Sequence, residues 1–144
     1  MFTRARHAFG AAVIAFCIAL SCAVGATAAT AGAAVSAKGH SSSAFCKAYN
    51  NLASYKGNTK TIGGFRSSLH HLRSLVQQAD KVAPPTVKAH LTAFLKDEAQ
   101  LQTVADKSSS YNALKNSSQA QTISGRLSTD GTPVDSYASS HCKG

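Results

Sequence analysis

The chain has 144 residues and a formal net charge of +9, from 15 lysines and arginines against 6 aspartates and glutamates. This length supports one small domain and excludes a multidomain enzyme. The cations are spread evenly and never form a run of three, whereas a nucleic-acid-binding arm or a polybasic membrane patch would cluster them. We therefore expect no nucleic-acid partner, and at most a weak attraction to anionic polymers of the cell envelope.

Residues 1–37 follow the pattern of a secretory signal peptide with its cleavage region. Arg4 and Arg6 form the basic start, an uncharged apolar run continues to Val24, and small residues with several Ala-x-Ala sites extend to Ala37. This order of basic, apolar and small residues predicts export and cleavage. The sequence thus predicts a secreted or extracellular protein, or one associated with the cell envelope.

Two other interpretations of this segment stay open. It could remain as an uncleaved membrane anchor, although its second half consists of small residues that gain little from lipid. Cys22 could instead carry a lipid after cleavage, although Ala19 stands where a bacterial lipobox normally has leucine. Contact with a membrane is expected only through one of these two routes.

The four cysteines fall into two groups. Cys17 and Cys22 lie in the signal segment, so Cys46 and Cys142 are the two that remain after export. In an oxidising compartment two such thiols tend to form a disulfide. Catalytic dithiols usually lie close together in sequence, whereas Cys46 and Cys142 lie near opposite ends of the remaining chain. We therefore predict a structural disulfide that joins the first helix to the last.

Residues 38–43 are small and polar and are expected to form a flexible leader before a helical domain at residues 44–144. In three successive segments of that domain, apolar residues recur at steps of three or four, which predicts three helices. Turns at residues 57–59 and 83–85 separate them, and Pro85 suits the first turn of the third. The three stripes comprise Phe45, Ala48, Tyr49, Leu52 and Tyr55; then Ile62, Phe65, Leu69, Leu72, Leu75, Val76 and Ala79; and then Val87, Leu91, Phe94, Leu95, Leu101, Val104 and Ala105.

The remainder of the chain does not fit one straight helix. Tyr111 and Leu114 would share a helical face from which Ile123 and Leu127 lie about 120–160° away, so we expect a break near residues 116–118.

A second break is predicted further on. Asp130 and Gly131 indicate a turn, and Thr132 followed by Pro133 has the pattern of a helix start. No segment alternates with the period of two that a strand requires. The predicted fold class is therefore all-α, as a single small bundle of four to five short helices closed by one disulfide.

Glu98 is the only glutamate of the chain and falls within the apolar stripe of the third helix, between Phe94 and Leu101. Burial raises the pKa of a lone carboxylate, which is how enzymes produce general acids. Such an acid usually needs a second carboxylate, a histidine or a nucleophile nearby, and the sequence assigns none. We therefore favour an ion pair with Arg66 or Arg73, and keep a hydrolase-type enzyme using Glu98 as an alternative.

No motif predicts a catalytic, metal-binding or cofactor-binding residue. His70 and His71 are adjacent, so they would point in different directions instead of binding one ion. The chain contains no Cys-x-x-Cys, His-Glu-x-x-His or Gly-x-Ser-x-Gly pattern. A carrier of a small ligand, haem or metal is the alternative that a helical bundle leaves open. The other histidines beyond the signal segment are His40, His90 and His141.

Three short motifs carry a family resemblance: residues 44–47 (Ala-Phe-Cys-Lys), residues 83–88 (Ala-Pro-Pro-Thr-Val-Lys), and Ser136-Tyr137 with His141-Cys142. Together they resemble small exported helical proteins of actinomycetes that have one N-terminal and one C-terminal cysteine. The resemblance implies export, a helical fold and the disulfide. It implies no particular activity and no catalytic residues.

These observations favour a secreted, non-catalytic helical domain that acts by surface contact at the cell envelope or outside the cell. Its partner stays open, with an anionic envelope polymer and another protein as the two candidates.

Overall fold

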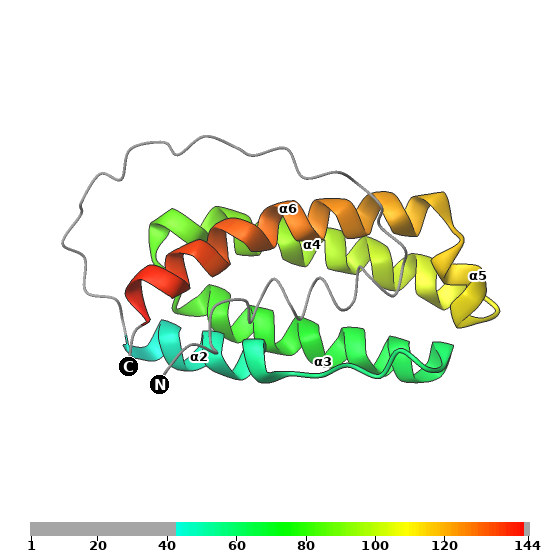
Figure 1. Ribbon diagram of the computed structural model, residues 1–144, viewed down its shortest axis with the longest axis horizontal. Helices are drawn as coiled ribbons and strands as arrows, with labels where there is room; N and C mark the ends of the chain where they lie inside the picture. Colours follow the sequence, from blue (N-terminus) through cyan, green and yellow to red (C-terminus); the bar gives the residue numbers. More distant parts are fainter. Residues whose placement is uncertain (1–42, 143–144) are drawn as a thin grey trace, which may run out of the picture.

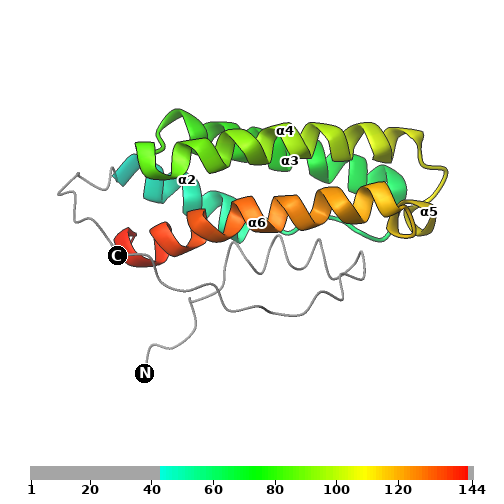
Figure 2. The ribbon, with the colours of Figure 1, turned by 90° about the horizontal axis from the view of Figure 1, so that it is seen from above.

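The computed structural model describes residues 43–142, which contain five helices and no strand. The helices are α2 (Ser43–Ser54), α3 (Ile62–Lys81), α4 (Pro85–Lys107), α5 (Tyr111–Lys115) and α6 (Ser118–His141). The three longest, α3, α4 and α6, lie side by side, while α2 packs at one end of the bundle and α5 lies at the other (Figure 1, Figure 2). The predicted all-α bundle is confirmed.

The predicted signal segment, residues 1–37 with Cys17 and Cys22, lies outside the described residues, as do residues 38–42 of the predicted leader. Ser43, the last residue of the predicted leader, is the first residue of α2.

Serine and threonine side chains set the starts of three helices. Thr61 Oγ1 accepts a hydrogen bond from Gly64 N at 3.1 Å, and Ser110 and Ser117 cap α5 and α6 in the same way. Pro85 is the first residue of α4, where its missing N–H costs no hydrogen bond. The break predicted near residues 116–118 is confirmed.

The second predicted break is wrong, because α6 continues through Asp130, Gly131 and Pro133 to His141. The buried residues of this helix recur at steps of three or four straight across Gly131 and Pro133. Packing of this continuous face along α4 outweighs the local helix-breaking tendency of glycine and proline. The buried residues are Ala120, Ile123, Ser124, Leu127, Gly131, Val134 and Ala138.

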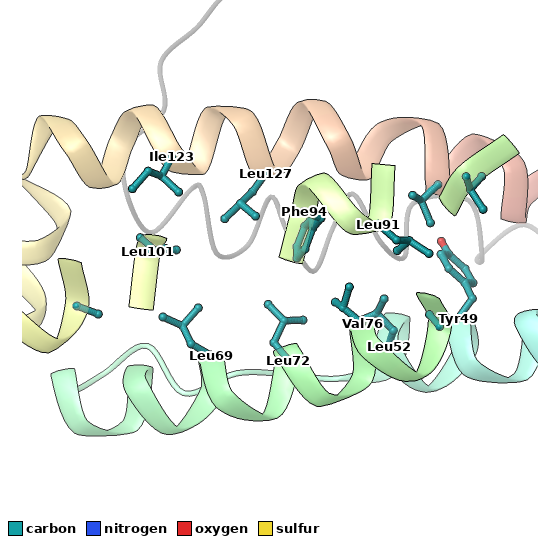
Figure 3. Packing of buried hydrophobic residues seen from close by; sticks show 14 of the residues in the cluster. Tyr49, Leu52, Leu69, Leu72, Val76, Leu91, Phe94, Leu101, Ile123 and Leu127 are labelled. Carbon is teal, nitrogen blue, oxygen red and sulfur yellow. The ribbon is translucent and has the colours of Figure 1, made fainter. Parts of the chain in front are cut away.

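The core follows the axis of the bundle, and each predicted stripe contributes to it. Figure 3 shows side chains of α3, α4 and α6 meeting between the helices, with α2 adding Tyr49 and Leu52 at one end. Burial of these side chains supplies the main free energy that holds the helices together. The labelled residues of the three long helices are Leu69, Leu72, Val76, Leu91, Phe94, Leu101, Ile123 and Leu127.

The connection between α2 and α3 runs along α3 to the opposite end of the bundle (Figure 1). Asn58 N donates to Ser68 Oγ at 2.7 Å, and Lys60 N donates to Asn58 Oδ1 at 3.0 Å. A Cβ added at Gly64 would lie 2.5 Å from Asn58 Nδ2, so glycine at this position lets the connection pack closely on α3. This packing fixes Lys60 beside α5.

Candidate functional site

One end of the bundle, which we name the disulfide end, is closed by a covalent bond. Cys46 of α2 and Cys142 after α6 form a disulfide with their Cα atoms 5.2 Å apart, which confirms the predicted pairing. Tyr49 adds a polar contact between the same two helices, because its hydroxyl donates to Asp135 Oδ1 at 2.8 Å. The first and last described helices are therefore fastened to each other twice.

Aromatic rings fill the space beside this disulfide. The Tyr137 ring meets the Phe45 ring edge-on with centroids 5.7 Å apart, and it stacks on the His141 ring at 4.0 Å. Phe45 is fully buried. These contacts give the disulfide end a structural role.

Glu98 is fully buried, and its Oε2 lies 2.6 Å from Arg73 Nη1. Its Oε1 is buried without a hydrogen-bond partner. Burial raises the pKa of Glu98 above 4.5, and this effect is larger than the opposing effects of Arg73 and His70. Glu98 lines neither of the two surface hollows described below, so its position fits a structural pair and not an acid that touches a substrate.

Arg66, the other arginine predicted to pair with Glu98, binds the end of α4 instead. Its guanidinium donates to the main-chain oxygens of Ala105, Asp106 and Ser108 at 2.9–3.1 Å, and its Nε lies 3.6 Å from Asp106 Oδ1. These carbonyls lie at the end of α4, where the regular hydrogen bonds of the helix stop, and Ser108 N also donates to Ala105 O at 3.1 Å. Arg66 therefore holds the start of α3 against the end of α4.

A second buried carboxylate, Asp97, was missed by the sequence analysis. Arg126 Nε donates to Asp97 Oδ2 at 2.9 Å, and Arg126 Nη2 donates to Gln100 Oε1 at 2.8 Å. Its spacing in the sequence predicts its burial, because Asp97 follows Phe94 by three residues and precedes Leu101 by four. With Ala93 and Lys96, these three side chains line an open hollow of about 460 Å³.

All six acidic side chains in residues 43–142 have a partner within the protein. Four of them pair with arginine or lysine, Asp130 lies 3.7 Å from His90, and Asp135 binds Tyr49. In this part of the chain, six exposed lysines make no such contact through their side chains, so their charges face solvent uncompensated. These unpaired lysines are Lys47, Lys56, Lys60, Lys81, Lys96 and Lys107.

The other end of the bundle, which we name the α5 end, carries an open hollow of about 300 Å³. Its walls come from the start of α3 and the start of α5, which lie far apart in sequence. The walls carry one ammonium group, several hydroxyls, one amide and one aromatic ring. The lining residues are Lys60, Thr61, Ile62, Ser109, Ser110, Tyr111 and Asn112.

Tyr111 anchors this hollow to the core. Its ring packs on Phe65 with centroids 5.3 Å apart, and Lys115 Nζ lies 5.8 Å from the Tyr111 ring centroid. The hydroxyl is buried and makes no hydrogen bond of standard geometry, and burial raises its pKa more than the Thr59 side chain lowers it. Tyr111 is therefore an uncharged hydroxyl donor at neutral pH.

The four histidines within residues 43–142 do not gather into a site. His70, His71 and His141 are exposed on different helices or faces, and His90 is half-buried beside Asp130. Within residues 43–142, no group of three or more histidine, cysteine, aspartate or glutamate side chains is placed to hold a metal ion. None of the helices in this range is both long and apolar enough to cross a membrane.

No protein family, no curated protein and no solved structure matches this chain. Its function must therefore be argued from the geometry and charges of its own residues.

Proposed function

We propose that this chain is an exported, non-catalytic helical domain that acts by surface contact, and that its partner is an anionic polymer of the cell envelope or of the extracellular space. The signal pattern of residues 1–37 supports export. The disulfide between Cys46 and Cys142 is consistent with an oxidising compartment outside the cytoplasm.

The observation that carries this proposal is a difference between the acidic and the basic side chains. Within residues 43–142 every acid is engaged by a neighbouring side chain, whereas six lysine ammonium groups point into solvent. A paired charge contributes little to the field outside the protein, so the field is set by the lysines that remain. A polyanion gains binding free energy from such a surface by releasing its counterions.

A polymer suits the described surface better than a protein partner does. Interfaces between proteins usually contain an apolar centre. In residues 43–142 the one large hydrophobic side chain that is exposed is Val82, and a single exposed apolar residue does not form a patch.

The test is binding of the full chain, expressed with its N-terminal segment and purified as the host processes it. Poly(glycerol phosphate) and polyphosphate serve as probes, and titration calorimetry is run from 20 to 200 mM salt. We expect binding at low salt that weakens steeply as salt is added. Absence of binding to either probe at low salt would overturn the proposal, as would hydrolysis of either polymer by the pure protein.

The small-ligand alternative is tested in the same titration. Glycerol phosphate monomer at equal phosphate concentration should bind far more weakly than the polymer, because one phosphate meets only one or two lysines. Equal affinity per molecule for the monomer and the polymer would favour a carrier of small anions.

A further inference from the structure

The α5 end differs from the rest of the surface in its local charge balance. Three lysines belong to it, Lys60 before α3, Lys107 in the last turn of α4 and Lys115 in the last turn of α5. The one acid at this end, Asp106, lies 3.6 Å from Arg66. None of the three lysines forms an ion pair with an acid of the described residues.

The elements that carry these lysines are held in fixed relation to one another. Arg66 binds the main-chain oxygens that end α4, which fastens the base of Lys107 to the start of α3. Tyr111 packs on Phe65 of α3, and Lys115 lies over the Tyr111 ring. The hollow between these elements is thus formed before any ligand binds, which lowers the entropic cost of binding.

Besides the ammonium group of Lys60, the hollow is lined by neutral side chains that can form hydrogen bonds. Ser109 and Asn112 are exposed at its rim. Phosphate oxygens can only accept hydrogen bonds from these two side chains. A ligand with hydroxyls between its anionic groups can also donate to the Ser109 hydroxyl oxygen and to the Asn112 amide oxygen.

From these observations we infer that the α5 end is the binding surface for a linear polyol phosphate, that is, a polymer with a phosphodiester in each repeat and hydroxyl-bearing units between them. Lys60, Lys107 and Lys115 contact the phosphates, and the exposed Ser109 and Asn112 side chains contact the polyol. This assignment rests on the proposed function and localises it. A bilayer surface is disfavoured, because the one exposed large hydrophobic side chain in the described residues, Val82, follows α3 at the opposite end.

The test compares two variants with the same change in charge. The first is Lys60→Gln/Lys107→Gln/Lys115→Gln at the α5 end. The second is Lys47→Gln/Lys81→Gln/Lys96→Gln, which removes three exposed lysines elsewhere, one of them also in the last turn of a helix. Affinity for poly(glycerol phosphate) is measured at 20 to 200 mM salt, and thermal melting checks that both variants fold.

We expect the first variant to bind about 100-fold more weakly at low salt and the second to bind within about fivefold of wild type. The slope of log affinity against log salt should fall by about 2 in the first variant alone. If both variants lose affinity equally, the proposed function stands and the α5 assignment fails. If wild-type protein does not bind, the proposed function itself fails. Equal or tighter binding to anionic lipid vesicles would also overturn the polymer assignment.

The polyol part is tested with Ser109→Ala/Asn112→Ala, which removes two exposed polar groups of the lining and leaves every charge in place. Because both side chains are exposed, their truncation should not destabilise the fold. We expect affinity for poly(glycerol phosphate) to fall about fivefold and affinity for polyphosphate to fall less, because polyphosphate can accept hydrogen bonds from these groups but cannot donate to them. An equal effect on both polymers, or no effect on either, would show that the surface recognises charge alone.

Discussion

The two ends of the bundle use their side chains in opposite ways. At the disulfide end, Cys46 is bonded to Cys142 and Tyr49 is bonded to Asp135, so covalent and polar groups are consumed in holding helices together. At the α5 end, Lys60 and several hydroxyls line an open hollow, and Lys107 and Lys115 lie on the elements beside it.

The charges follow the same division. At the disulfide end Asp135 accepts a hydrogen bond from Tyr49, whereas the α5 end has three lysines and one acid, and that acid is already paired with Arg66. The disulfide end therefore holds groups that stabilise the fold, whereas the α5 end holds the groups that would attract an anionic ligand. The comparison predicts that each can be changed without changing the other.

The largest effect on stability should come from removing the disulfide. In Cys46→Ser/Cys142→Ser we expect a loss of about 2–5 kcal/mol in the free energy of unfolding, because closure of a 96-residue separation restricts the unfolded chain. Urea denaturation under non-reducing conditions measures it. The folded fraction should still bind poly(glycerol phosphate) with wild-type affinity. A large loss of affinity in the folded variant would show that the two ends are coupled.

A smaller effect, dependent on pH, is expected at Glu98, which lies between the two ends. Burial raises its folded-state pKa above the unfolded value of 4.5, so its contribution favours the folded state below about pH 4.5 and is lost as pH rises through the folded-state pKa. Glu98→Gln cannot ionise. Its unfolding free energy should therefore rise relative to wild type as pH increases from 4 to 7.

Urea denaturation of both proteins at pH 4, 5, 6 and 7 checks this sign. If wild type instead gains stability relative to Glu98→Gln across this range, the Arg73 pair outweighs burial and the folded-state pKa is lowered. Binding at the α5 end should be the same in both proteins.

The smallest effect concerns two neighbouring glycines at the start of α3. A Cβ at Gly63 would have no atom within 4 Å, so Gly63→Ala should stabilise the protein by about 0.5–1 kcal/mol. A Cβ at Gly64 would meet the Asn58 side chain, which holds Lys60 N. Gly64→Ala should therefore gain less, and should weaken polymer binding by displacing Lys60. Equal thermal melting temperatures and equal affinities for both variants would contradict the packing described for residues 58–64.

Much of the fold follows from the spacing of apolar residues along the chain. The three stripes, the Pro85 start and the break before Ser118 are local patterns, and each is found in the structure. The exception is residues 130–133, where a local turn pattern predicts a break that packing against α4 prevents. The local sequence predicts that Gly131 interrupts a helix, whereas in the structure it is one of the buried residues of α6.

The candidate surface could not be predicted from the sequence in the same way. Lys60, Lys107 and Lys115 are spread over the chain, and their even spacing argued against a basic patch. They share one end because the α2–α3 connection runs along the first part of α3 to the α5 end, and because Tyr111 of α5 packs on Phe65 of α3. The choice of Arg73 over Arg66 as the partner of Glu98 likewise depends on how α3 and α4 pack.

The most direct test of the division between the two ends is a titration of the ¹⁵N-labelled protein with poly(glycerol phosphate), followed by amide chemical shifts at low salt. The division predicts that the largest shifts fall on residues 60–62 and 107–115, with the amides near Lys47, Lys81 and Cys142 unchanged. Shifts of similar size around Lys47, Lys81 and Lys96 would contradict it, because the polymer would then follow total charge and not the α5 end.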